Sequence, residues 1–197
     1  QATRLVESGA RDLAMFYGID GHTDSDDYRR LVADLKDHRL AGIVFTAPSA
    51  AFGLPEVNVP GFARAAIMAG TNPGMSSVFP DYDSFVSRAL DWLASRRRRR
   101  LAVIAATQMA ESFVGQAVAQ AERRRLRSRP YWQLRLDSLD VAAAERVGHL
   151  LMHAGQRERP DSGLIMDDHL VPGITAGLID AGVVSGRDLG TVAHHNF

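Results

Sequence analysis

The sequence predicts an α/β fold built on parallel sheets, and three observations support this prediction. Short apolar runs alternate with amphipathic helical patterns along the whole chain, which is the order expected of α/β proteins. The run Leu101–Ala105 is apolar throughout, as in strands that helices cover on both faces. The stretch 161–197 contains a complete strand, helix and strand, and two strands joined in this way in one sheet run parallel.

The first part of the chain predicts one strand-helix-strand unit and two further extended segments. We expect a strand at Leu13–Tyr17, a helix at Ser25–His38 and a strand at Gly42–Thr46. The helix is predicted because apolar residues recur on one face at intervals of three or four. Beyond a loop with several prolines, we expect a strand at Ala65–Ala69 and a short extended piece at Ser77–Phe79.

The middle of the chain continues the alternation. Amphipathic patterns predict helices at Asp81–Arg96 and Ser112–Arg124, on either side of the buried strand Leu101–Ala105. A strand is expected at Tyr131–Leu136, and a further helix begins after Ser138.

Local signals define the last unit in more detail. The apolar run Gly163–Met166 predicts a strand. Asp168 is expected to cap the next helix, with Pro172 in the first turn, where a missing N–H costs little. Gly182 predicts the end of that helix, and Thr191–Ala193 predicts the following strand.

Polar residues follow the last two predicted strands and predict the functional site. In open α/β sheets the ligand crevice lies at the carboxyl ends of the strands. Asp167 and Asp168 follow one strand, and His194, His195 and Asn196 follow the next. For Asp168, two interpretations stay open, a helix cap alone or a cap that also contacts a ligand. For the two histidines, packing and ligand contact are equally open.

Metal binding and catalysis are the weaker interpretations of this cluster. Carboxylate and imidazole groups suit zinc or iron, but neither an HxxxH nor an HExxH spacing joins these residues, so we predict no metal site. The sequence contains no GxGxxG, GxxxxGK[ST] or GxSxG motif. We therefore expect no catalytic residues, no cofactor and no enzyme activity.

Composition and charge narrow the class of protein further. The 197 residues are 46% hydrophobic and 23% charged, with a formal net charge of zero, so the overall balance gives no reason to expect polyanion binding. Zero cysteines exclude disulfides and thiolate sites. No apolar run approaches the roughly 20 residues that span a bilayer, and the N-terminal residues lack a signal-peptide pattern. We expect a cytoplasmic protein with no membrane contact.

Four stretches of the sequence resemble passages of one known family. They are, in order, DYRRLVADLKDHRLAGIVFT, SSVFPDYDSFVSRALDWLASRRRRRLAVIA, FVGQAVAQAERRRL and GLIMDDHLVPGITAGLIDAGVVSGRDLGTVAHHN. Their order and spacing agree with those of lactose-repressor-type (LacI/GalR) transcriptional regulators. The chain is therefore similar to the effector-binding domain of that family.

The resemblance implies a two-lobed α/β domain of the periplasmic-binding-protein type (type I), with parallel sheets flanked by helices. Residues 1–75 would form part of the N-terminal lobe and residues 76–197 part of the C-terminal lobe, so that the domain is incomplete at both ends. The helix-turn-helix DNA-binding domain that precedes this domain in the family is absent from this chain.

The resemblance also implies a function. The family's repressors sense a small polar, sugar-like molecule between the lobes, form homodimers and contact operator DNA through the N-terminal domain. The alternative is a periplasmic-type solute-binding protein for a sugar or related molecule, which a signal peptide in place of a helix-turn-helix would indicate. An α/β enzyme acting on a sugar or nucleotide is a third possibility, because fold does not fix function.

The ligand-contacting positions of the family carry over unevenly. Asp167 occupies the position of a ligand-contacting amide, and Asp168 the acidic position after it. His195 stands where a sugar-binding aspartate is usual, and Ser112 where an arginine is usual. Because sugars are held by charged and amide groups that bond paired hydroxyls, these departures leave the effector's identity open. The predicted ligand-binding residues are Asp167, Asp168, His195, Asn196, Ser112 and Ser49.

The arginine run Arg96–Arg100 has two interpretations. Together with the arginines between Arg123 and Arg129 it suggests a phosphate-binding surface. However, it lies at a helix end, where cations complement the helix dipole, and immediately before a buried strand. We therefore expect a solvated surface turn, as in the family, whose usual GHRR stands at the same place.

Overall fold

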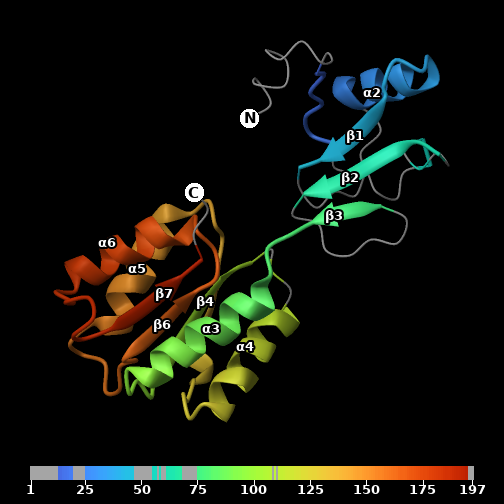
Figure 1. The fold of residues 1–197 in the computed structure, drawn as a ribbon. Coiled ribbons are helices and arrows are strands. Elements are labelled where there is room, and N and C mark those ends of the chain that lie inside the picture. The colour runs from blue at the N-terminus through green and yellow to red at the C-terminus, as the bar shows by residue number, and fades with distance from the viewer. Residues whose placement is uncertain are drawn as a thin grey trace. The chain divides into compact units, whose positions relative to one another are not determined.

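A computed structural model describes residues 13–19, 25–46, 55–56, 58, 61–67, 75–107, 109 and 111–194. The chain divides into two compact units, residues 1–80 and 81–197, and each unit has its own sheet (Figure 1). Within the described ranges, no helix is long and apolar enough to cross a membrane.

The first unit contains one helix and a parallel sheet of three strands in the order β1-β2-β3. Its elements are α2 (Asp26–Lys36), β1 (Gly42–Phe45), β2 (Ala63–Ile67) and β3 (Ser76–Val78). The helix begins where the sequence predicts, because the Ser25 side chain accepts a hydrogen bond from the Tyr28 N–H at 3.1 Å. The structure places β3 in the first unit.

The strand predicted at Leu13–Tyr17 is wrong. Residues 13–19 contain no strand, and side chains of α2 bind their backbone instead. The Tyr17 N–H donates to the Asp27 carboxylate at 2.6 Å, and the Arg30 guanidinium donates to the carbonyl of Met15. These bonds give one amide and one carbonyl of the run side-chain partners in place of strand partners.

The second unit contains four parallel strands in the order β5-β4-β6-β7, alternating with helices as predicted. Its elements are α3 (Tyr82–Ser95), β4 (Leu101–Ala106), α4 (Glu111–Arg123), the 3₁₀ helix η2 (Pro130–Trp132), β5 (Gln133–Leu136), α5 (Val141–Met152), β6 (Ser162–Ile165), α6 (Leu170–Asp180) and β7 (Gly190–Ala193). The strand predicted from Tyr131 starts later, because Pro130 opens a helical turn that the Trp132 N–H closes on the Arg129 carbonyl at 2.9 Å.

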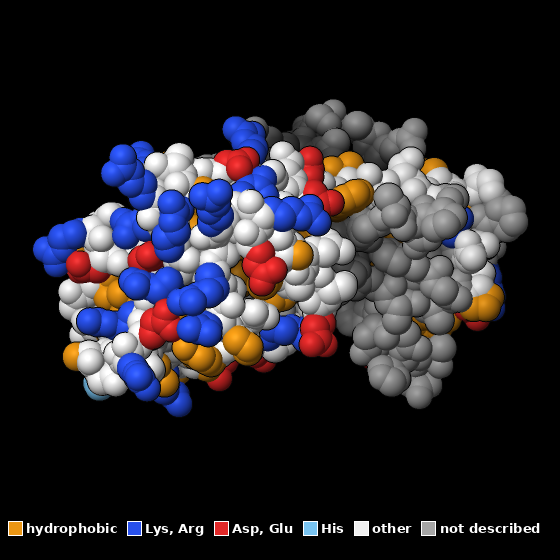
Figure 2. Space-filling view, turned by 90° about the horizontal axis from the view of Figure 1, so that it is seen from below, with side chains coloured by type: hydrophobic (Ala, Val, Ile, Leu, Met, Phe, Trp, Pro, Cys, Tyr) orange, Lys and Arg blue, Asp and Glu red, His pale blue; other side chains and the backbone are white. Residues whose placement is uncertain are grey.

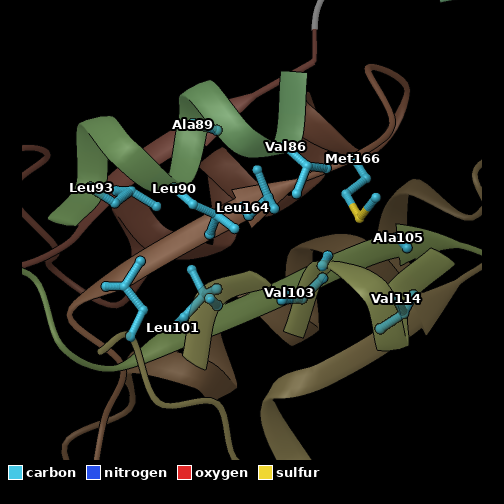
Figure 3. Close-up of a cluster of buried hydrophobic side chains, with 13 residues drawn as sticks. Val86, Ala89, Leu90, Leu93, Leu101, Val103, Ala105, Val114, Leu164 and Met166 are labelled. Atoms are coloured by element: carbon cyan, nitrogen blue, oxygen red, sulfur yellow. The ribbon is translucent and has the colours of Figure 1, made fainter. Parts of the chain in front are cut away.

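Helices cover both faces of this sheet. In Figure 3, Val86, Leu90 and Leu93 point from α3 toward Leu164 of β6 and Val103 of β4. The opposite face carries a second buried cluster, to which Ile104 and Ile165 contribute from the sheet and residues of α5 and α6 contribute from the helices. A sheet covered on both faces explains why β4 is fully buried along its six residues.

Glycines allow α5 and α6 to approach closely. A Cβ atom built on Gly177 would lie 1.8 Å from the Glu145 carbonyl oxygen, and one built on Gly148 would lie 2.4 Å from the Ile174 carbonyl oxygen. Both clashes are with backbone atoms of the facing helix, which cannot rotate away. The contact between these helices therefore depends on glycine at these two positions.

A carboxylate orders the loop between α6 and β7. Asp188 accepts hydrogen bonds from the Val184 N–H and from the Arg187 guanidinium, each at 2.9 Å. The Arg187 hydrogen bond and the Val184 amide lower the pKa of Asp188 to about 2, because both favour the charged carboxylate.

This lowered pKa predicts an acid-dependent contribution to stability. A carboxyl group with a lowered pKa in the folded state stabilises the fold above its unfolded pKa, near 3.9, and loses that contribution as the pH falls through its folded pKa. We expect the melting temperature of the wild-type chain to exceed that of Asp188→Asn at pH 6, and the difference to shrink between about pH 4 and pH 2. Circular dichroism melting curves of both proteins over this range measure it. A constant difference would contradict the assignment.

Candidate functional site

The predicted ligand-binding residues that the structure describes follow strands at the carboxyl edge of the second sheet. Because all four strands are parallel, the segments that follow them emerge at one edge. Ring contacts show that two helices begin there as well. Tyr82, the first residue of α3, lies with its ring centroid 5.3 Å from that of His194, which follows β7. Phe113, in the first turn of α4, contacts the Tyr82 ring edge-on at 5.5 Å.

The turn after β6 contains Asp167 and Asp168, and both side chains are largely buried, with 17% and 21% exposed. The prediction that Asp168 caps α6 is wrong. The capping position is held by His169, whose side chain makes no capping bond. Instead, Asp167 accepts the His169 N–H at 2.9 Å. The reason is a tight turn before the helix, in which the amides of Leu170 and Val171 bond back to the carbonyls of the two aspartates. Pro172 lies in the first turn as predicted, and Gly182, with φ 73°, ends the helix.

The His169 imidazole lies against both carboxylates. Its Nδ1 is 3.2 Å from an oxygen of Asp167 and 3.2 Å from an oxygen of Asp168. One carboxylate oxygen from each aspartate and one imidazole nitrogen of His169 lie within 4.8 Å of one another. These contacts stay within one turn of the chain, and they hold the two carboxylates in a fixed orientation at the sheet edge. Carboxylates held in this way can accept hydrogen bonds from ligand hydroxyl groups.

Aromatic residues lie beside the carboxylates. Burial raises the pKa of the Tyr82 phenol, and the nearby charges of Asp167 and Asp168 raise it further. The phenol therefore keeps its proton and can donate a hydrogen bond. The His194 ring contacts the rings of Tyr82 and Phe85, and the backbone N–H of His194 donates to the Ile165 carbonyl at 2.9 Å. Of the two interpretations that the sequence leaves open for His194, packing and ligand contact, the structure shows packing.

Of the remaining predicted ligand-binding residues, the structure describes only Ser112. Ser112 is exposed in the first turn of α4, next to Phe113. His195, Asn196 and Ser49 lie outside the described residues.

Two features of this edge were missed from the sequence. The sequence analysis gives Tyr82 and Phe113 no role. Their place in the first turn of a predicted helix is the one sequence feature that could have pointed to this edge. Arg135, in β5, was also not singled out. Its guanidinium donates to the carbonyls of Thr107 and Met109, the latter at 2.7 Å, so it orders the segment after β4.

A separate histidine pair lies at the end of α5, His149 in its last turn and His153 directly after it. The rings of His149 and His153 are 5.4 Å apart, an HxxxH spacing outside the cluster considered above. His149 Nδ1 lies 2.6 Å from the Asp180 carboxylate, and His153 Nδ1 accepts the Gly155 N–H at 3.1 Å. One ring nitrogen of His149 therefore contacts α6, and one ring nitrogen of His153 bonds the loop that follows α5.

No protein-family model matches the sequence, and no curated protein is significantly similar to it. Solved structures do match. A LacI family transcriptional regulator from Lactobacillus casei, crystallised with glucose, matches 95% of this chain and 71% of its own, with a TM-score of 0.72 and 20% identity. With sucrose bound, the same protein gives a TM-score of 0.73 over 95% of this chain and 70% of its own, again at 20% identity.

Two further structures agree. A protein from Bacillus cereus subsp. cytotoxis NVH 391-98, assigned as a LacI transcriptional regulator, matches 99% of this chain and 69% of its own, with a TM-score of 0.73 and 15% identity. A protein from Burkholderia thailandensis, assigned as a ribose operon repressor, matches 87% of this chain and 64% of its own, with a TM-score of 0.64 and 19% identity. This chain has the fold of LacI-type regulators. The LacI-type fold confirms the predicted fold class, and the chain spans between 64% and 71% of the length of these matched chains.

Proposed function

We propose that this chain is the effector-binding part of a LacI-type transcriptional regulator and that its effector, a small polar molecule of the sugar class, contacts the carboxyl edge of the second sheet. The observation that carries the proposal is the arrangement at that edge. Two largely buried carboxylates, Asp167 and Asp168, are held there beside the phenol of Tyr82. The carboxylates and the phenol can form hydrogen bonds with ligand hydroxyls. The neighbouring aromatic rings can cover the apolar face of a sugar ring.

Two further observations support this proposal. The sequence resemblance and the fold point to the same family. The Lactobacillus casei protein, which has this fold, holds glucose and sucrose in its crystals. We propose the same class of ligand here, with Ser112, Ser49, His195 and Asn196 as further contacts.

A thermal-shift screen of this chain tests the proposal. The panel contains neutral sugars, sugar acids, sugar phosphates, nucleosides and divalent metals. A ligand present at about 100 times its dissociation constant adds roughly 2.7 kcal/mol of stability, so a true effector raises the melting temperature clearly. For the best ligand, Asp168→Ala is expected to weaken binding by roughly 10-fold to 100-fold in isothermal titration calorimetry, because a hydrogen bond to a charged group contributes about 1.5–3 kcal/mol.

The matched control is Asp180→Ala, which removes a carboxylate from the other end of α6, where the side chain is 69% exposed. It should bind the ligand like the wild-type chain. Equal affinity for the ligand in Asp168→Ala and in the wild type would show that the effector does not use this edge. A folded chain that no compound stabilises would argue against effector binding altogether, and turnover of a hit would favour an enzyme.

The regulatory role follows from linkage. We propose a cytoplasmic homodimer that contacts operator DNA through a helix-turn-helix domain N-terminal to this region. An effector can change operator affinity only by its difference in affinity for the DNA-competent and DNA-incompetent states. A gene whose product carries a signal peptide in place of a helix-turn-helix would instead indicate the solute-binding alternative.

A further inference from the structure

Charge is segregated between the two edges of the second sheet, although the chain as a whole is neutral. The described connections at the carboxyl edge, 137–140 and 166–169, contain only acidic charges. At the amino edge, the connection 96–100 contains five arginines and the connection 124–132 contains four, with no carboxylate in either. The connections 153–161 and 181–189 add Arg157, Arg159 and Arg187, balanced there by Glu158, Asp161 and Asp188, so the excess of positive charge comes from the first two connections. Figure 2 shows Lys and Arg side chains gathered over this unit in the view from below.

Hydrogen bonds join these four connections into one surface, which we call the basic face. The Asp161 carboxylate accepts the N–H groups of Arg99 and Arg100. Arg98 donates to the carbonyls of Gly186 and Arg187. The guanidinium groups of Arg127 and Arg129 both lie on Glu158. The arginines therefore belong to a single ordered edge, although they come from segments far apart in the sequence.

Part of this positive charge is not neutralised. Arg97, Arg99, Arg125 and Arg157 are exposed. Among the residues that the structure describes, no carboxylate lies within 4.0 Å of their guanidinium groups. The Arg99 guanidinium donates to the Arg98 carbonyl at 3.0 Å, so the positive charge of all four side chains stays available to an anionic partner.

The backbone conformation at two of these arginines allows a test in which charge and stability change in opposite directions. Arg97 and Arg125 follow the ends of α3 and α4 with φ angles of 59° and 62°. This left-handed conformation favours glycine, and α6 ends on Gly182 in the same conformation. Two helices at the basic face therefore end on arginine where glycine would make the fold more stable. His38 follows α2 in the same conformation, with φ 55°, so a non-glycine residue at a helix end is not confined to the basic face.

Against the expectation of only a solvated turn at Arg96–Arg100, we infer that the basic face binds the phosphate backbone of a nucleic-acid duplex. All its cations are arginine, whose planar guanidinium matches phosphate in a bidentate geometry. The cations are spread over four connections of one rigid edge, which suits a regular array of phosphates better than a single small anion. The inference is independent of the proposed effector site, because that site lies at the opposite edge of the sheet.

Fluorescence anisotropy of this chain with a labelled duplex of random sequence tests the inference. Binding should weaken steeply between about 50 mM and about 200 mM salt, because neutralised phosphates release counterions. The decisive variant is Arg97→Gly with Arg125→Gly. It should lose roughly tenfold or more in affinity, and its log–log salt slope should fall by about two. Its melting temperature should rise, since glycine relieves the left-handed conformation at both positions. Loss of binding with a gain in stability cannot result from unfolding.

The control is Arg29→Gln with Arg39→Gln, which removes two exposed arginines from the first unit and so gives the same net charge. It should bind the duplex like the wild type. If both double variants lose affinity equally, or if neither does, the basic face is not the binding surface. Stronger binding to polyglutamate, or to vesicles containing phosphatidylserine, than to the duplex would overturn the inference in favour of an acidic protein or a membrane. Effector binding measured in the same variants should not change.

Discussion

Replacing Gly177 by alanine should destabilise the second unit more than any other single methyl group added to its helices. The new Cβ would lie 1.8 Å from the Glu145 carbonyl oxygen and 2.7 Å from the His149 amide nitrogen. Both are backbone atoms of α5, so the clash is relieved only if the two helices move apart. Because overpacking typically costs 1–3 kcal/mol and occasionally more, we expect a loss of about 3 kcal/mol in the free energy of unfolding.

Urea denaturation followed by circular dichroism measures this effect. Gly115→Ala is the matched control, since Gly115 lies inside α4 and a Cβ there meets nothing within 4 Å. Alanine should stabilise this helix by about 0.5–1 kcal/mol relative to glycine. The same substitution should therefore have opposite signs at the two positions. A Gly177→Ala protein as stable as the wild type would show that α5 and α6 do not pack as described.

Replacing Asp161 by alanine should cost nearly as much. Its carboxylate accepts the N–H groups of Arg99 at 3.0 Å and Arg100 at 2.9 Å, and it lies 3.8 Å from the Arg100 guanidinium with only 19% of the side chain exposed. Alanine leaves two amides at the entry to β4 without this acceptor. We expect a loss of about 2 kcal/mol in the free energy of unfolding, because hydrogen bonds to a charged acceptor contribute about 1.5–3 kcal/mol and the Arg100 amide is partly buried.

Two comparisons make this prediction specific. Asp161→Asn keeps one acceptor oxygen and should lose less than alanine, about 1 kcal/mol. Asp180→Ala removes an exposed carboxylate whose contact with His149 is a surface pair, so it should change stability by less than about 1 kcal/mol. Chemical denaturation of the three variants gives the ranking. Equal losses for Asp161→Ala and Asp180→Ala would mean that Asp161 does not hold the start of β4.

The alternation of strand and helix could be predicted because each element carries its own periodicity. The run Leu101–Ala105 is apolar at every position, and the structure buries β4 on both faces. The Leu13–Tyr17 run has a similar local signal but forms no strand, and α2 side chains bond its Tyr17 amide and its Met15 carbonyl instead. Hydrophobic pattern alone cannot separate these cases, because the partner of a strand lies elsewhere in the chain.

The candidate site was predicted in part. Asp167 and Asp168 could be located because polar residues directly follow a buried strand, and parallel strands end at one edge. Tyr82 could not be assigned to that edge, since it lies 85 positions before Asp167 in the printed sequence and meets it only when α3 packs on the sheet. The cap of α6 was misassigned because a turn before the helix moved its start to Leu170.

The sequence by itself determined the order of the elements, the parallel direction of the second sheet and the edge at which the acidic residues lie, since these follow from local periodicity and chain connectivity. The tertiary structure alone decided which side chains meet. It brought Tyr82 to the carboxylates, pressed Gly177 against the backbone of α5, and gathered arginines from four connections at the opposite edge. These contacts join residues far apart in the chain, and only the packing of helices on a common sheet specifies them.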